Sequence, residues 1–188
     1  LAGEDFGKVE AVLHQGACAD TVERDGRYMM DANFEVTKEI FVWSQARRVP
    51  LVYASSAAVY GASGDFTEDG SGEMPLNVYG WSKLVFDRWL RRRMDALAAP
   101  VVGLRYFNVY GPRMDTHGAY TEVLIRWMER IAAGQAPAIF GNGLQTMDWV
   151  HVEDIARANI LAAQGPVTDE VFNVASGTET SLNDLAKL

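Results

Sequence analysis

The sequence has a single cysteine among its 188 residues, Cys18, and this scarcity excludes an internal disulfide framework. One free thiol suits a reducing compartment, so we expect a cytoplasmic protein. No run of apolar residues approaches the ~18 that a membrane-spanning helix requires. A signal-peptide pattern is also missing, although the chain begins with Leu1 and not with Met. We therefore expect no membrane partner.

An excess of basic residues is missing as well. The 17 Lys and Arg are outnumbered by 25 Asp and Glu, which gives a formal net charge of -8 at pH 7. Surfaces that bind nucleic acid are usually basic, so we expect no nucleic-acid partner. An anionic ligand would have to be held by local donors rather than by the overall field. With 48% hydrophobic residues, a chain of this length can bury one sizeable core. We expect no metal site.

A glycine-rich phosphate-binding loop is the third feature that the sequence lacks. What the chain does contain is an alternation of short apolar runs with helical patterns. The apolar runs indicate strands at 10–14, from Leu51 onward, and at 100–106, 138–140 and 170–174. Helical spacing marks 31–45, a segment opening at Tyr79, 120–133 and 153–163, and a capping box at 181–184 begins a last helix. This order predicts an α/β fold with a doubly wound parallel sheet, Rossmann-like in type.

Two neighbouring stretches carry the side chains with the clearest chemical potential. The first, from Leu51 to Gly61, predicts a buried strand whose carboxyl end holds Ser56. The second opens a helix with Tyr79 and Lys83. Residues four apart lie on one face of a helix, so these two side chains point the same way.

This arrangement has a chemical use. A free tyrosine titrates near pKa ~10, and a neighbouring ammonium lowers that pKa toward the working range. The hydroxyl of Ser56 could hold the same substrate oxygen. Together, Ser56, Tyr79 and Lys83 could remove a proton from an alcohol while a hydride leaves its carbon. The alternative is an exposed helical pair without a catalytic role, because the Tyr-x-x-x-Lys spacing alone occurs in many proteins.

Four motifs give the chain a resemblance to a known family. They are Ser55-Ser56-Ala57-Ala58-Val59-Tyr60-Gly61, the Tyr79 to Lys83 pair, the run from Arg105 to Arg113, and the run from Asp148 to Asp154. The chain resembles the extended short-chain dehydrogenase/reductase family, specifically its nucleotide-sugar epimerases and dehydratases. The resemblance implies NAD or NADP as cofactor, a nucleotide-diphosphate sugar as substrate and homo-oligomeric assembly. It implies epimerisation by transient oxidation of a sugar carbinol to a ketone.

The resemblance also implies roles for individual residues. Tyr79 would be the acid/base, Lys83 its pKa tuner and ribose anchor, and Ser56 a hydrogen-bond partner of the reacting oxygen. The positions that would contact the dinucleotide are Gln15, Gly16, Ala17, Cys18, Asn33, Lys83, Tyr106 and Val109. Those that would contact the sugar nucleotide are Ser56, Asn108 and Arg113. The alternatives are a tight turn at 15–18, a helix-capping or core-bonded asparagine, and a surface arginine.

The two parts of the chain point to different relatives, which leaves the substrate open. Residues 9–113 resemble 6-epimerases of ADP-glycero-manno-heptose, whereas residues 114–188 resemble UDP-hexose 4-epimerases. The heptose enzymes carry a second acid/base lysine where this chain has His117, which makes His117 a candidate for that role. The alternative, which we favour from the residues after Arg113, is an exposed loop histidine and a ketone that turns over within the site. An arginine that many relatives use to grip the diphosphate is Met147 here.

Two further functions compete with the epimerase hypothesis. A 4,6-dehydratase is disfavoured because such relatives carry Asp-Glu where this chain has Ala57-Ala58. A non-catalytic binding protein on the same fold would commonly have lost the tyrosine or the lysine. We expect residues 1–113 to be part of a dinucleotide-binding domain, and 114–188 to contribute to a substrate lobe and return to the sheet. Without the glycine-rich βαβ unit and with its last helix cut short, the chain is expected to be a fragment that is inactive alone.

Overall fold

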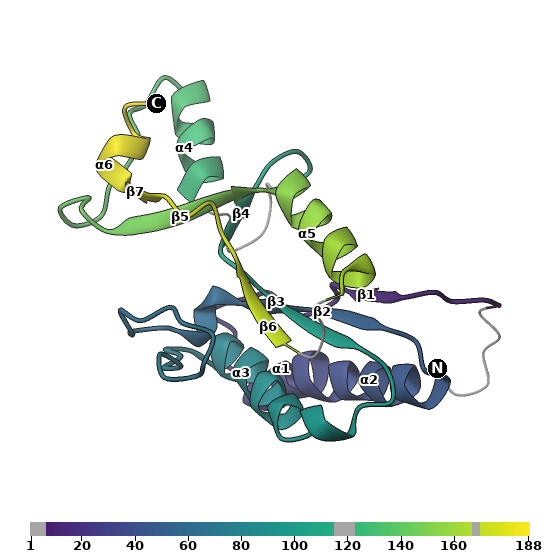
Figure 1. Ribbon diagram of the computed structural model, residues 1–188. Coiled ribbons are helices and arrows are strands. Elements are labelled where there is room, and N and C mark those ends of the chain that lie inside the picture. The colour runs from purple at the N-terminus through teal and green to yellow at the C-terminus, as the bar shows by residue number, and fades with distance from the viewer. Residues whose placement is uncertain (1–6, 115–122, 167–169) are drawn as a thin grey trace.

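The computed structural model describes residues 7–114, 123–166 and 170–188. Its centre is a four-stranded parallel sheet in the order β1-β2-β3-β6 (Figure 1). The strands are β1 (Val12–His14), β2 (Leu51–Ser56), β3 (Val101–Tyr106) and β6 (Glu170–Val174). Ser55 lies opposite Arg105 and Ser56 opposite Tyr106. Because parallel strands end at the same edge of a sheet, their terminal side chains gather there.

Helices cover both faces of this sheet (Figure 1). On one face lie α1 (Gly26–Met30), a π-helical turn (Asp31–Glu35), α2 (Val36–Arg47) and α3 (Val78–Arg91). On the other lies α5 (Val152–Gln164). The predicted doubly wound α/β fold is therefore confirmed.

Alternation along β2 explains how both faces are filled. Leu51 and Tyr53 pack with Phe86 and Leu90 of α3, while Val52 belongs to a second cluster against the alanines of α5. Successive side chains of a strand point to opposite faces, so a strand that is covered on both sides is apolar almost throughout. The predicted strands at 10–14, from Leu51, at 100–106 and at 170–174 are all present.

A second, smaller sheet was not predicted. It joins β4 (Asn108–Tyr110), β5 (Thr146–His151) and β7 (Glu179–Ser181), with α4 (Val123–Ala132) and α6 (Leu182–Leu185) beside it. The central strand β5 pairs with β4 in parallel and with β7 in antiparallel orientation. The predicted capping box is confirmed, since the Ser181 hydroxyl accepts the Asp184 amide at 3.1 Å.

The strand predicted at 138–140 is wrong, because these residues belong to neither sheet. Their carbonyl groups are taken by side chains instead of a neighbouring strand. The Trp127 indole donates to the Ala138 carbonyl at 2.9 Å, and the Gln145 amide donates to the Phe140 carbonyl at 3.0 Å. A short apolar run can thus satisfy its backbone without forming a sheet.

The start of α3 is fixed by its cap and by a glycine. The Asn77 side chain accepts the Gly80 amide at 2.8 Å, which satisfies a backbone donor of the first turn. A Cβ on Gly80 would lie 2.5 Å from the carbonyl oxygen of Ala58. Only glycine therefore allows the first turn of α3 to pack this closely against the turn after β2. The close approach places Tyr79 beside Ser56.

The helices in the described part of the chain are all too short or too polar to span a membrane. Within residues 7–114, 123–166 and 170–188, no group of three His, Cys, Asp or Glu side chains is arranged to hold a metal ion.

Candidate active site

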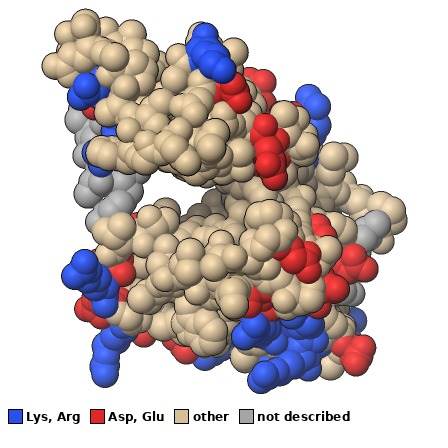
Figure 2. All heavy atoms as spheres, turned by 90° about the vertical axis from the view of Figure 1, so that its left-hand side faces the viewer, with Lys and Arg blue, Asp and Glu red and all other residues tan. Residues whose placement is uncertain are grey.

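A cleft of about 960 Å³ opens at the carboxyl edge of the main sheet. Figure 2 looks onto this edge and shows the molecule hollowed between its two parts, with mostly uncharged walls. The predicted site residues that line the cleft are Gln15, Ala17, Ser56, Tyr79, Lys83, Tyr106, Asn108 and Val109. Other lining residues, which the sequence analysis did not assign to the site, include Phe66, Phe107, Thr146, Asp148 and Asn173.

Ser56 and Tyr79 meet at the base of this cleft. Ser56 is the last residue of β2, with an extended backbone, and its hydroxyl accepts the Ala58 amide at 3.1 Å. The same side chain lies close enough to the Tyr79 phenol to lower its pKa. The end of a strand and the first turn of a helix thus bring together the hydroxyl groups that the sequence placed in one site.

Lys83 lies one helical turn after Tyr79 and is 7% exposed. Its ammonium donates to the Ala54 carbonyl at 2.9 Å, so it is tied to β2. Burial lowers the pKa of Lys83 to about 8, against an opposing effect of the Asp87 carboxylate. An ammonium has three donors, so Lys83 can hold a ligand hydroxyl in addition to Ala54.

The role of Lys83 as pKa tuner of Tyr79 stays a prediction. Burial raises the pKa of the Tyr79 phenol above its ordinary value, and the nearby Ser56 side chain offsets this only in part. Desolvation disfavours the phenolate, so the phenol is protonated at neutral pH. A base role of Tyr79 therefore needs a positive charge that enters the cleft with a ligand.

Asn33 lies behind the cleft rather than in its wall. It is 1% exposed and belongs to the π-helical turn. Its side chain accepts the Cys18 amide at 2.7 Å and donates to the Cys18 carbonyl at 3.0 Å. It also donates to the Ser82 hydroxyl at 2.9 Å. Asn33 therefore ties the loop after β1 to α3, which matches the core-bonded alternative.

Three side chains close the cleft on the side of α5. The Tyr106 hydroxyl donates to Gln15 at 2.9 Å, and Asn159 donates to Tyr106 at 2.7 Å. Gln15 in turn donates to Asn159 at 2.9 Å. The triangle joins the loop after β1 to β3 and α5. The sequence predicted Gln15 and Tyr106 but gave no signal for Asn159, which is distant in the chain.

The remaining predicted residues lie elsewhere. Gly16 and Cys18 belong to the loop that carries Gln15 and Ala17, but neither lines the cleft. Arg113 is exposed, has a left-handed backbone (φ 70°) and does not line the cleft either. His117 lies outside the described residues.

His14 ends β1 and is 9% exposed. Its Nε2 lies 2.9 Å from the Thr37 hydroxyl, which donates its own proton to the Asn33 carbonyl at 2.6 Å. His14 must therefore donate from Nε2, which is the neutral Nε2–H tautomer. Burial, reinforced by the nearby Lys83 ammonium, lowers the pKa of His14 to about 4.

This depressed pKa predicts acid sensitivity. Between pH 6.5 and about 4, the unfolded chain binds a proton at His14 more readily than the folded chain does, so stability falls as the pH falls through this window. His14→Gln removes the titration while keeping a polar side chain. We expect the melting temperature of the wild type to drop further between pH 7 and 4.5 than that of the variant. Equal drops in a calorimetric scan would contradict the prediction.

A doubly wound parallel sheet with serine, tyrosine and lysine at its carboxyl edge defines a Rossmann-like class of dinucleotide-dependent enzymes. Comparison with known proteins agrees. Residues 2–175 match the model of the NAD dependent epimerase/dehydratase family, and the chain belongs to this family.

Individual relatives extend the comparison. ADP-L-glycero-D-manno-heptose-6-epimerase of Alkalilimnicola ehrlichii is 46% identical over 191 residues, which cover 98% of this chain and 60% of the relative. A solved UDP-N-acetylglucosamine 4-epimerase from Methanobrevibacter ruminantium M1, in complex with UDP-N-acetylmuramic acid, has a TM-score of 0.87 at 30% identity. The heptose 6-epimerase of Helicobacter pylori has a TM-score of 0.86 at 31% identity. These two matches cover 95% and 94% of this chain and 58% and 56% of theirs. The chain thus spans about 60% of the length of its curated relative.

Proposed function

We propose that the protein is an NAD-dependent nucleotide-sugar epimerase, which oxidises a sugar carbinol to a ketone and reduces it again from the other face. The observation that carries the proposal is that Ser56, Tyr79 and Lys83 come together, with Lys83 one turn after Tyr79 on α3. All three line one cleft of about 960 Å³ at the carboxyl edge of the sheet. That edge is where open α/β sheets bind their ligands.

The residues of the cleft fit the dinucleotide. Small side chains such as Ala17 line the wall after β1, where a ligand can approach the backbone. The Lys83 ammonium would hold ribose hydroxyls with the donors that Ala54 leaves available. When bound, NAD supplies the acceptor for the hydride that leaves the sugar carbon, and its oxidised ring carries positive charge.

The protein side chains handle the proton. Ser56 would hydrogen-bond the reacting hydroxyl and hold it beside the Tyr79 phenol. A positive charge in the cleft favours the phenolate and offsets the effect of burial, so Tyr79 can take the substrate proton and later return it. A proton transfer of this kind contributes typically ~10²–10⁴-fold to the rate.

We propose a nucleotide-diphosphate heptose as the substrate, with UDP-hexoses as the second candidate. The 46% identity to a heptose 6-epimerase supports the first. The 4-epimerase among the similar structures supports the second. A second acid/base at His117 stays a prediction of the heptose hypothesis. Homo-oligomeric assembly stays a prediction of the resemblance, supported by exposed apolar side chains on the helical layer, such as Val42 and Trp81.

The substrate is tested with the NAD-loaded holoenzyme. It is incubated with ADP-glycero-manno-heptose and, separately, with UDP-hexoses, and the epimeric proton is followed by NMR. We expect turnover of the heptose and much slower turnover of the hexoses. Selective loss of heptose turnover in His117→Ala would assign His117 as the second acid/base. An NAD-loaded protein that epimerises none of these sugars would overturn the proposed function.

A further inference from the structure

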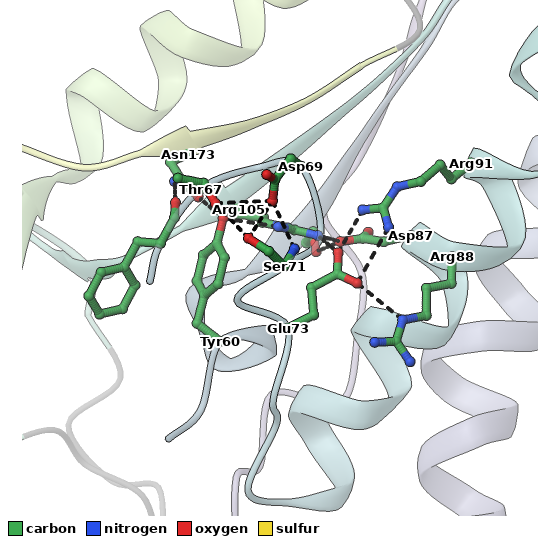
Figure 3. Close-up of polar contacts among 12 residues, drawn as sticks. Tyr60, Thr67, Asp69, Ser71, Glu73, Asp87, Arg88, Arg91, Arg105 and Asn173 are labelled. Carbon is green, nitrogen blue, oxygen red and sulfur yellow. Dashed lines mark hydrogen bonds and ion pairs between the residues drawn. The ribbon is translucent and has the colours of Figure 1, made fainter. Parts of the chain in front are cut away.

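An ionic network is buried directly behind the cleft (Figure 3). Arg105 and Asp87 are both fully buried. The Arg105 guanidinium donates to one carboxylate oxygen of Asp87 from Nε at 3.1 Å and from Nη2 at 3.0 Å. It also donates to the Tyr60 hydroxyl at 2.9 Å and to Glu73 at 2.6 Å. The guanidinium of β3 thus has partners on α3, on the turn after β2 and on the segment before α3.

The same carboxylate reaches the strand that carries Ser56. The Ser55 hydroxyl donates to Asp87 at 2.9 Å, and Ser55 lies opposite Arg105 in the strand register. Asp87 itself lies about two turns after Tyr79 on α3. One carboxylate therefore holds together the end of β2, the end of β3 and the helix that bears Tyr79.

Stability alone is a poor explanation for this arrangement. Withdrawing two charges from water costs energy, and well-packed apolar residues of similar volume are often as stabilising as a buried ion pair. Phe86 and Leu90 lie near Asp87 on α3 and belong to the hydrophobic core. Apolar side chains can therefore be packed in this region. Polar contacts of fixed geometry do something that apolar packing does not, since they set the position of one element relative to another.

We propose that Ser55, Asp87 and Arg105 form a positioning device that holds the end of β2 against α3 and so keeps Ser56 beside Tyr79. The device acts through Ser56 and Tyr79; Asp87 and Arg105 do not line the cleft, whereas Ser55 does. The inference rests on the proposed function, because the effect on catalysis presupposes that Tyr79 is the acid/base. A misplacement of about 1 Å at a reacting group can lower a rate by ~10²-fold.

The structure offers a matched control for Ser55. The Tyr53 hydroxyl donates to the same carboxylate of Asp87, also at 2.9 Å, and Tyr53 and Ser55 are both 2% exposed. Tyr53 lies further from the strand end and is not part of the device. Ser55→Ala and Tyr53→Phe each delete one hydroxyl donor to Asp87. Only Ser55→Ala removes the contact between Asp87 and the residue that directly precedes Ser56.

In the NAD-loaded holoenzyme, we expect Ser55→Ala to lower kcat about 10- to 100-fold while KM for the sugar nucleotide stays within about twofold. Tyr53→Phe should leave kcat within about twofold of the wild type. Both variants should lose a similar few degrees of melting temperature. Equal kcat for the two variants at similar stability would overturn the positioning role. An inactive wild type would instead be a failure of the proposed function.

A second measurement tests the positioning role without an activity assay. The tyrosines are labelled with ¹³C and titrated by NMR, with the Tyr79 signal assigned from its absence in Tyr79→Phe. The Ser56 side chain lowers the pKa of Tyr79, so a displacement of Ser56 in Ser55→Ala should raise that pKa. An unchanged titration of Tyr79 in Ser55→Ala would overturn the proposal whether or not the enzyme is active.

Discussion

Tyr79→Phe is expected to lower the epimerase turnover of the NAD-loaded holoenzyme by roughly 10²–10⁴-fold. The substitution deletes the phenolic oxygen that lies beside Ser56 and leaves the ring in place. The cleft keeps its shape, so dinucleotide binding should change little. Steady-state assays give the turnover, and calorimetric titration with NAD gives the binding. Near-normal turnover would remove Tyr79 from the mechanism.

Tyr110→Phe provides the matched control. Tyr110 is 38% exposed, packs edge-on against His151 and does not line the cleft. Loss of its hydroxyl should leave turnover within about twofold of the wild type. A comparable loss in both variants would mean that the effect comes from the fold and not from the proton transfer at Tyr79.

Asp87→Ala is expected to destabilise the fold by about 3–5 kcal/mol, the usual cost of breaking a buried ion pair by removing one partner. The Arg105 guanidinium would stay buried without two of its hydrogen bonds, while Ser55 and Tyr53 would lose their acceptor. Urea unfolding of the wild type and the variant gives the difference in the free energy of unfolding.

Arg157→Ala provides the comparison for this prediction. Its guanidinium lies 3.8 Å from Asp154, and the two side chains are 75% and 60% exposed. Exposed pairs of this kind contribute little because water screens them. The variant should lose only a small fraction of the stability that Asp87→Ala loses. Similar losses would contradict the assignment of Asp87 to a buried, tightly coupled network.

Local patterns explain what the sequence could predict. The apolar run at Leu51 and the helical spacing after Tyr79 depend on neighbouring residues, so strand, helix and the Tyr79–Lys83 face could be predicted. Ser56 could be added to the predicted site because the end of its strand and the start of the helix meet at one edge of the sheet. The short strands β4, β5 and β7 carry no strong alternation, and their pairing depends on segments far apart in the chain.

Long-range contacts explain what the sequence could not predict. Asn159 meets Gln15 across 144 positions, and no local pattern connects them. Burial raises the pKa of Tyr79, and burial is a property of the whole fold, so this direction could not be predicted from the sequence. Asp87 follows Lys83 by one turn, but its place opposite Arg105 depends on how α3 packs on the sheet.

The proposed transient oxidation of the sugar carbon is tested most directly with a sugar nucleotide that carries deuterium on the carbon to be epimerised. The NAD-loaded holoenzyme is given this substrate in ordinary water, and the epimer is examined by NMR and mass spectrometry. If the hydride leaves and returns within the cleft, the epimer keeps its deuterium. Epimer in which solvent hydrogen has replaced the deuterium would show that the carbon is deprotonated instead, and would contradict the proposed role of the Ser56–Tyr79–Lys83 site.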